Sequence, residues 1–359
     1  GPAAATQVEI PTLFTAQKAP TGFPTAGAGG TLSWDDGTRT FSITGSHDIY
    51  IDGVRLTRPT GSLVLADVTG VHFIYYNAAG TLSETTTFAT MGYDLPFVAT
   101  VYWHSSVGKG LLGAERHGIQ MDGGTHRWMH STVGTRYVSG LTGTFLDASF
   151  DVTAGSIADE DVVHAIGNQT AANVLYKDGS ADWKWVAASA LYYHAPGGAL
   201  QYNSGNALAA VPDANHAASW VFATNDPTTP VVAVIGQRVD VTLANARANN
   251  TYEGLSLGSL PYQEMKLLYR VLLKNVGGTP TSVETQDYRS ISNVPAGTYL
   301  ATTHSVLSNP GMSTGDDHTQ YALLAGRAGG QTLIGSTAVD GYLKLVSTSG
   351  VGTTDYISL

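Results

Sequence analysis

Short apolar runs alternate with turn-forming residues through the first third of the chain. The segments 40–43 and 71–76 have the composition of β-strands, and 97–103 is nearly continuously apolar, as in a buried strand. Between alternating apolar positions, Asp52-Gly53 is a strong signal for a tight hairpin turn. Strands at this spacing predict a β-sandwich or a barrel.

The same rhythm continues in the middle of the chain. Two apolar runs, 219–224 and 231–236, are joined by a segment whose prolines force a loop. The segment 265–274 reads as a further strand, and 243–253 is the place where we expect one short helix. A second β-rich domain is the simplest interpretation.

The pattern changes again after residue 293. Residues 316–327 have acidic residues placed for a helix cap and Gly326 as a stop, which predicts one short helix. Two brief strand segments follow. So little local sequence cannot bury their apolar side chains within one chain, whereas three copies around an axis can. The side chains expected in this trimer interface are Tyr321, Leu323, Leu324, Leu333, Ile334, Leu343 and Leu345.

The predicted fold class is therefore mainly all-β and trimeric, with two β-sandwich-like domains followed by a short helix and a fibrous β C-terminal segment. The expected parts are an N-terminal arm (1–33), a β-sandwich-like domain (34–118), a second β-rich domain (119–292), a linker (293–315) and a trimerising helix with the start of a fibrous shaft (316–359).

The amino-acid composition excludes several classes of function. Only 13% of the residues are charged, and the formal net charge of -10 opposes binding to a phosphate backbone, so we expect no nucleic-acid partner. The absence of cysteine removes disulfides and thiolate chemistry. No run of 18 or more residues is apolar, and the N-terminus lacks a basic segment followed by an apolar core, so neither membrane insertion nor a signal peptide is predicted.

The densest group of candidate metal ligands is Glu115, His117, Asp122, His126 and His130. His126 and His130, at i and i+4, share one face only if their segment is helical, and Gly123-Gly124 argues against a helix there. The acidic residue of a zinc-protease motif does not follow His126. We favour hydrogen bonding at the junction of two domains and keep a metal site as the alternative.

A second candidate involves His318 beside Asp316 and Asp317. In a trimer these residues form a ring that could hold a cation on the axis, although a helix cap is the favoured interpretation. No cofactor is predicted.

The acidic run Asp159, Glu160 and Asp161 is a candidate for catalysis, because carboxylate pairs hydrolyse glycosides. Adjacent residues point in different directions, and we expect a solvated turn instead. The aromatic residues that could stack on sugars are expected in the core, and these are Trp183, Trp185, Tyr192 and Tyr193. Without a nucleotide loop, triad motif or thiol centre, the sequence predicts no enzyme.

The segment NPGMSTGDDHTQYALLAGRAGGQTLIG (309–335) closely resembles one found in tail fibre and virion structural proteins of tailed bacteriophages. It departs from that pattern at Gly315, where an acidic residue often stands. Blocks such as DIYIDGVRL and SWVFATNDPTTPVVAVIGQ also resemble, in order, those of a phage structural protein family.

The resemblance implies a virion appendage, usually homotrimeric, that contacts other phage tail or virion proteins and a host cell-surface receptor through a distal tip. It implies no catalytic mechanism. A tailspike-like depolymerase acting on host surface polysaccharide and a capsid-mounted head fibre are the alternatives.

Overall fold

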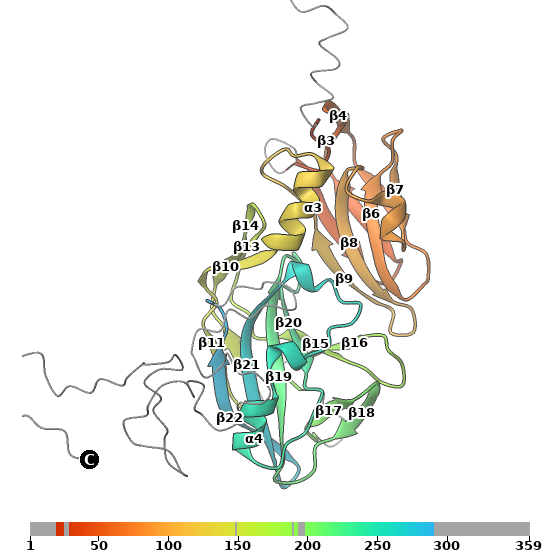
Figure 1. Cartoon of the computed structure of the whole chain (residues 1–359). Coiled ribbons are helices and arrows are strands. Elements are labelled where there is room, and N and C mark those ends of the chain that lie inside the picture. Colours follow the sequence, from red (N-terminus) through yellow and green to blue (C-terminus); the bar gives the residue numbers. More distant parts are fainter. Residues whose placement is uncertain (1–18, 25–28, 148, 189, 193–197, 291–359) are drawn as a thin grey trace, which may run out of the picture. The chain divides into compact units, whose positions relative to one another are not determined.

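The computed structural model describes residues 19–24, 29–147, 149–188, 190–192 and 198–290, which all fall within one compact unit, residues 1–298 (Figure 1). In this part the chain is mainly β, as predicted, with several separate sheets. The predicted segments from residue 293 onward lie outside the described residues, and the predicted domain boundaries stay predictions.

The first sheets form a layered apolar core. A three-stranded antiparallel sheet has the order β1-β2-β5, a hairpin pairs β3 with β4, and a four-stranded antiparallel sheet has the order β7-β6-β8-β9. Their bounds are β1 (Thr31–Asp35), β2 (Thr40–Thr44), β3 (His47–Ile51), β4 (Val54–Arg58), β5 (Gly61–Val64), β6 (Gly70–Tyr76), β7 (Leu82–Thr85), β8 (Phe97–His104) and β9 (Lys109–Ala114). Phe41, Ile43, Ile74 and Val101 are fully buried between them.

Two sequence signals are confirmed here. Asp52-Gly53 joins β3 to β4, and both residues have the positive φ angles (47° and 80°) that such a two-residue turn requires. Every residue of β8 is buried, in agreement with its nearly continuous apolar sequence.

Beyond α3 (Gly123–Thr132), a six-stranded sheet dominates, in the order β16-β15-β20-β19-β21-β22. Only the pair β15–β20 is parallel. The bounds are β15 (Ala172–Tyr176), β16 (Lys184–Ala188), β19 (His216–Thr224), β20 (Val231–Ile235), β21 (Met265–Val276) and β22 (Thr279–Asp287).

Smaller elements surround this sheet. They are β10 (Thr135–Gly140), β13 (Gly155–Asp159) and β14 (Val162–Ile166) in one sheet, the pair β11 (Gly143–Phe145) and β12 (Phe150–Val152), the pair β17 (Gln201–Ser204) and β18 (Ala207–Ala210), the helices α2 (Phe88–Met91) and α4 (Leu243–Asn249), and the 3-10 turns η1 (Tyr252–Gly254) and η2 (Tyr262–Glu264). The single helix expected over 243–253 is thus shorter, because α4 ends at Asn249 and a separate 3-10 turn follows.

The central strands of the six-stranded sheet are buried on both faces, whereas its edge strands β16 and β22 are partly exposed. Along β19, Val221 packs into one apolar cluster while Trp220 and Phe222 pack into the other. This explains its unbroken apolar run, which is typical of strands covered on both sides. Tyr102 of β8 belongs to the second cluster and its hydroxyl accepts a hydrogen bond from the Trp183 amide (2.9 Å), so this core extends to the four-stranded sheet.

The edge strand β9 has its outward amides occupied by side chains. The N–H of Gly110 donates to Asp36 (2.8 Å), that of Leu112 to Asp226 (3.1 Å) and that of Ala114 to Asn225 (3.1 Å). Asn225 also donates back to the Ala114 carbonyl (2.8 Å), as a neighbouring strand would. Side chains thereby replace a further strand along this edge.

Candidate metal centre

The helix α3 forms where its glycines argued against one. Asp122 caps it, its carboxylate accepting from the amides of Gly124 (2.9 Å) and Thr125 (3.2 Å). A Cβ on Gly123 would lie 2.5 Å from the Tyr93 carbonyl oxygen, so this position needs glycine for close packing. Near a helix start the entropic cost of glycine is small beside a good cap, and the sequence prediction underestimated this balance.

Asp122 is therefore a helix cap, whereas His126 and His130 are buried side by side, with 1% and 4% of their surfaces exposed. Their ring centroids are 4.7 Å apart. The ring of Tyr93 packs against both, at centroid distances of 4.6 and 5.2 Å. The i, i+4 spacing thus places two imidazoles on one helical face, as the helical alternative required.

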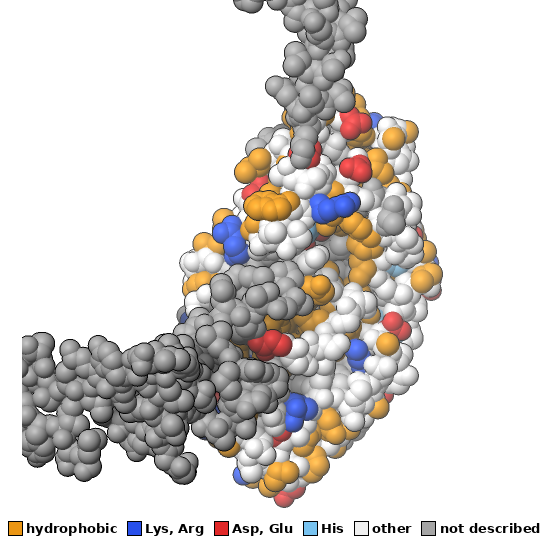
Figure 2. Space-filling model, viewed as in Figure 1, with side chains coloured by type: hydrophobic (Ala, Val, Ile, Leu, Met, Phe, Trp, Pro, Cys, Tyr) orange, Lys and Arg blue, Asp and Glu red, His pale blue; other side chains and the backbone are white. Residues whose placement is uncertain are grey.

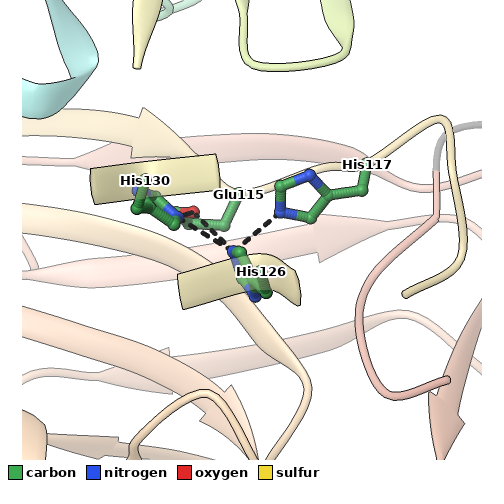
Figure 3. A group of neighbouring side chains, drawn as sticks. All are labelled: Glu115, His117, His126 and His130. Atoms are coloured by element: carbon green, nitrogen blue, oxygen red, sulfur yellow. Dashed lines mark hydrogen bonds and ion pairs between the residues drawn. The ribbon is translucent and has the colours of Figure 1, made fainter. Parts of the chain in front are cut away.

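Glu115 and His117 reach the same place from the segment after β9 (Figure 3). Backbone hydrogen bonds from the Glu115 amide to the Val98 carbonyl (2.9 Å) and from the His117 amide to the Phe23 carbonyl (3.0 Å) hold this segment in an extended form. Because the two residues are at i and i+2, both side chains project to the same side, toward α3.

The four side chains converge through one atom each. The Nε2 atom of His126 lies 2.8 Å from Nε2 of His117 and 2.9 Å from Nε2 of His130. An oxygen of Glu115 is 3.3 Å from Nε2 of His130 and 4.0 Å from Nε2 of His126. One candidate ligand atom from each residue lies within 4.8 Å of all the others, and all four residues are buried.

A hairpin turn carries two more carboxylates into this region. Strands β13 and β14 pair from Asp159 and Val162 outward, which leaves Glu160 and Asp161 as the turn, with Glu160 at a φ of 49°. The predicted turn is confirmed. The predicted solvation is wrong, because only 6% of Asp159 and 2% of Glu160 are exposed. Asp159 accepts hydrogen bonds from Thr135 and Asn225.

These carboxylates face the outer nitrogens of two histidines. Nδ1 of His117 lies 3.1 Å from an oxygen of Asp161. Nδ1 of His130 lies 3.2 Å from Glu160 and 3.1 Å from Glu264, which ends η2. Glu160 makes no side-chain hydrogen bond to any described residue, although its oxygens are buried. We call Glu115, His117, His126, His130, Glu160, Asp161 and Glu264 the histidine–carboxylate cluster.

Burial and charge oppose each other in this cluster. Burial and the neighbouring imidazoles lower the pKa of His126, whereas at His130 the carboxylates of Glu115 and Glu264 overcome burial and raise its pKa. Burial raises the pKa of Glu160 to about 9. At Asp161 burial is outweighed by hydrogen bonds from His117 and the Ile119 amide, so its pKa is lowered. The carboxylates therefore favour positive charge on His130, whereas the surroundings of His126 disfavour a proton there.

Only some of the site residues predicted from the sequence meet in the cluster. His126 and His130 meet Glu115 and His117 as the metal alternative proposed, and Asp122 stands apart as a cap. The acidic run was noted in the sequence but not connected to the histidines, and Glu264 was missed. The second metal candidate and the trimer-interface candidates lie outside the described residues, and they are Asp316, Asp317, His318, Tyr321, Leu323, Leu324, Leu333, Ile334, Leu343 and Leu345.

The aromatic residues weighed as sugar platforms are core residues where they are described. Trp183, Trp185 and Tyr192 are 0%, 5% and 3% exposed, in agreement with the interpretation favoured from the sequence. The indole N–H of Trp183 donates to the Leu257 carbonyl at 2.7 Å. Tyr193 lies outside the described residues.

Among the described residues, every helix is too short or too polar to cross a bilayer. Comparison of the chain with known protein families, with curated proteins and with solved structures finds no match.

Proposed function

We propose that this chain is a structural segment of a tailed-bacteriophage tail fibre or related virion appendage, located in the virion and supporting host attachment. The observation that carries the proposal is the resemblance of residues 309–335 to tail fibre and virion structural proteins. The chain assembles as a homotrimer, with sandwich-like domains preceding a fibrous shaft, and it contacts other virion proteins and, through a distal tip, a host receptor.

The β-rich body supports a mechanical role. Three large apolar clusters fill it, and its strands β19 and β21 are almost entirely buried. The acidic run that would serve a depolymerase lies in the buried histidine–carboxylate cluster, where a polysaccharide chain would find no open groove. We therefore propose a non-enzymatic role and put forward no second function.

The surface supports the absence of a nucleic-acid partner. On the face drawn in Figure 2, charged side chains are few and lie singly among uncharged and apolar atoms. Together with the net charge of -10, this gives a phosphate backbone little to bind.

Trimerisation is tested by light scattering on the full chain after size exclusion. We expect three times the chain mass of 37.5 kDa. The double variant Leu323→Asp, Leu324→Asp should dissociate to monomers, because charges at these positions oppose burial against sister chains. Val241→Asp, at a position 71% exposed in the body, is the matched control and should leave the mass unchanged. A wild-type monomer would contradict the trimer.

The virion location is tested separately with antibodies against the body, which should label an appendage of particles of the source virus in electron micrographs. The non-enzymatic role is tested by incubating the chain with host surface polysaccharide. Released oligosaccharide would refute it.

A further inference from the structure

We propose that Glu115, His117, His126 and His130 bind one divalent transition-metal ion of the zinc type, and that this ion fastens α3 to the segment after β9. This goes beyond the proposed function, and it does not depend on it.

The four side chains converge on one point. Nε2 atoms of three imidazoles and an oxygen of Glu115 point toward one centre (Figure 3). The contacts between these atoms run from 2.8 to 4.0 Å, and no two of the four atoms are more than 4.8 Å apart. In a tetrahedral zinc site with bonds of about 2.0–2.1 Å, ligand atoms lie roughly 3.3 Å apart, within that span. An ion would need only small side-chain adjustments.

The outer ring nitrogens of His117 and His130 have the orientation expected of metal-binding histidines. A histidine that binds metal through one nitrogen usually donates its other N–H to a carboxylate, which fixes the ring and its tautomer. Here Nδ1 of His117 faces Asp161, and Nδ1 of His130 faces Glu160 and Glu264. Both rings therefore already present Nε2 to the centre with a carboxylate behind them.

The number of hydrogens that the three imidazole rings carry also favours a bound ion. Nε2 of His126 lies within hydrogen-bonding distance of two other Nε2 atoms. Its single lone pair can accept from only one of them, and if both donated to it while their Nδ1 atoms donated to the carboxylates, two buried imidazolium ions would surround one atom. A metal ion gives all three lone pairs one shared acceptor and leaves the Nδ1 hydrogens for the carboxylates.

The buried carboxylate of Glu160 also favours a bound ion. Its side chain is 2% exposed, lies 3.2 Å from Nδ1 of His130 and 3.5 Å from Nδ1 of His117, and makes no hydrogen bond to the described residues. A buried carboxylate costs free energy unless positive charge lies nearby. A dication at the centre of the cluster supplies that charge.

The donor set selects the class of ion. Three imidazoles and one carboxylate suit zinc and its transition-metal neighbours, whereas magnesium and calcium prefer oxygen ligands. Four protein ligands in a closed, buried site are typical of a structural ion and leave no open coordination position for catalysis.

The test uses the full chain without a histidine tag, stripped of metal with a chelator and titrated with Zn²⁺ by calorimetry. We expect one ion bound per chain, and elemental analysis after dialysis should give the same ratio. Zinc at 100 times its dissociation constant should raise the Tm by about 5 °C or more. Co²⁺ should give the visible spectrum of a tetrahedral site, while Mg²⁺ and Ca²⁺ should have no effect.

Single substitutions measure how much individual residues contribute to zinc affinity. His126→Ala should abolish stoichiometric binding, and Asp161→Asn should weaken it by about 10- to 100-fold, as expected of a carboxylate behind a ligand. His72→Gln is the matched control, because His72 is fully buried against Glu84 (3.1 Å) but has no part in the cluster. It should bind zinc as tightly as the wild type.

If His126→Ala fails to fold, the wild-type titration and Asp161→Asn still decide. A wild-type chain that neither retains nor binds zinc would overturn the metal site. An Asp161→Asn variant equal to the wild type in zinc affinity would overturn the role of Asp161 behind His117. Light scattering in parallel keeps this outcome separate from the proposed trimer.

Discussion

The six-stranded sheet and the histidine–carboxylate cluster are both buried, but they are stabilised in opposite ways. In the sheet, residues such as Val221, Phe222 and Val234 are fully buried among other apolar side chains. In the cluster, Glu115 and Glu160 are 3% and 2% exposed among imidazoles and other carboxylates. The sheet gains free energy from each apolar group it removes from water, whereas the cluster must recover the cost of desolvating charge.

This difference has a practical consequence. The apolar contacts of the sheet should be insensitive to metal and, Lys266 in β21 apart, the sheet should respond little to moderate changes in pH, because apolar burial involves neither. Stability of the cluster should depend on what neutralises its carboxylates. Substitutions in the two regions therefore separate these contributions.

The largest loss is expected for Phe222→Ala in β19. Phe222 is fully buried, so truncation should leave a cavity and lower the free energy of unfolding by about 3–5 kcal/mol. Urea denaturation measures this, and the loss should be equal with and without zinc. Val241→Ala, at a position 71% exposed, is the control and should change stability by less than about 0.5 kcal/mol. A zinc-dependent loss would erase the contrast between the two regions.

In metal-free protein, His130→Ala should cost about 3 kcal/mol, because it leaves Glu115, Glu160 and Glu264 buried without their imidazole partner. Denaturation in the presence of a chelator measures the loss. Thr132→Ala, on the exposed side of α3, is the control and should change little. A His130→Ala variant as stable as the control would show that the cluster contributes nothing without metal.

Lys266 offers a stabilising change within the sheet. It is 1% exposed in β21, and burial lowers its pKa from 10.5 to about 8, against the opposing influence of Asp287. The unfolded chain therefore binds more protons between about pH 8 and 10.5, so wild-type stability should rise with pH across that window.

Lys266→Met removes this dependence. At pH 7 it should stabilise the protein by about 1–3 kcal/mol, less the hydrogen bond to the Tyr288 carbonyl (3.3 Å), and the advantage should shrink as the pH approaches 10.5. Denaturation at several pH values measures it. A gain independent of pH would mean that packing, and not charge burial, is its cause.

The smallest effect is expected outside both regions, in the β3–β4 hairpin. Gly53 has a φ of 80°, and an added Cβ would meet only ordinary contacts, the nearest at 3.4 Å. Gly53→Ala should therefore cost about 1 kcal/mol through backbone strain alone. Gly254→Ala, without a positive φ, should cost less, and equal losses would contradict this explanation.

Local patterns predicted most of the described fold. The turn at Asp52-Gly53, the buried strand β8 and the long strand β21 follow from residues adjacent in sequence, because hairpin geometry and apolar runs are local properties. The order of strands in the six-stranded sheet, including the parallel pair β15–β20, depends on contacts between distant segments and was beyond the sequence argument.

The cluster shows the same limit. The i, i+4 pair His126 and His130 was visible in the sequence, but the helix that aligns them depends on a tight contact with Tyr93. Glu264 lies 134 positions after His130 and carries no local signal that connects it to the histidines. The acidic run at 159–161 was visible in the sequence, but nothing local connected its carboxylates to the histidines.

The occupied edge of β9 also bears on how copies of the protein avoid aggregation. An unpaired edge strand can recruit the edge of another molecule and start sheet-to-sheet aggregation. Asp36, Asn225 and Asp226 take up the amides that such recruitment would need. Copies crowded side by side are thereby kept from fusing along this edge.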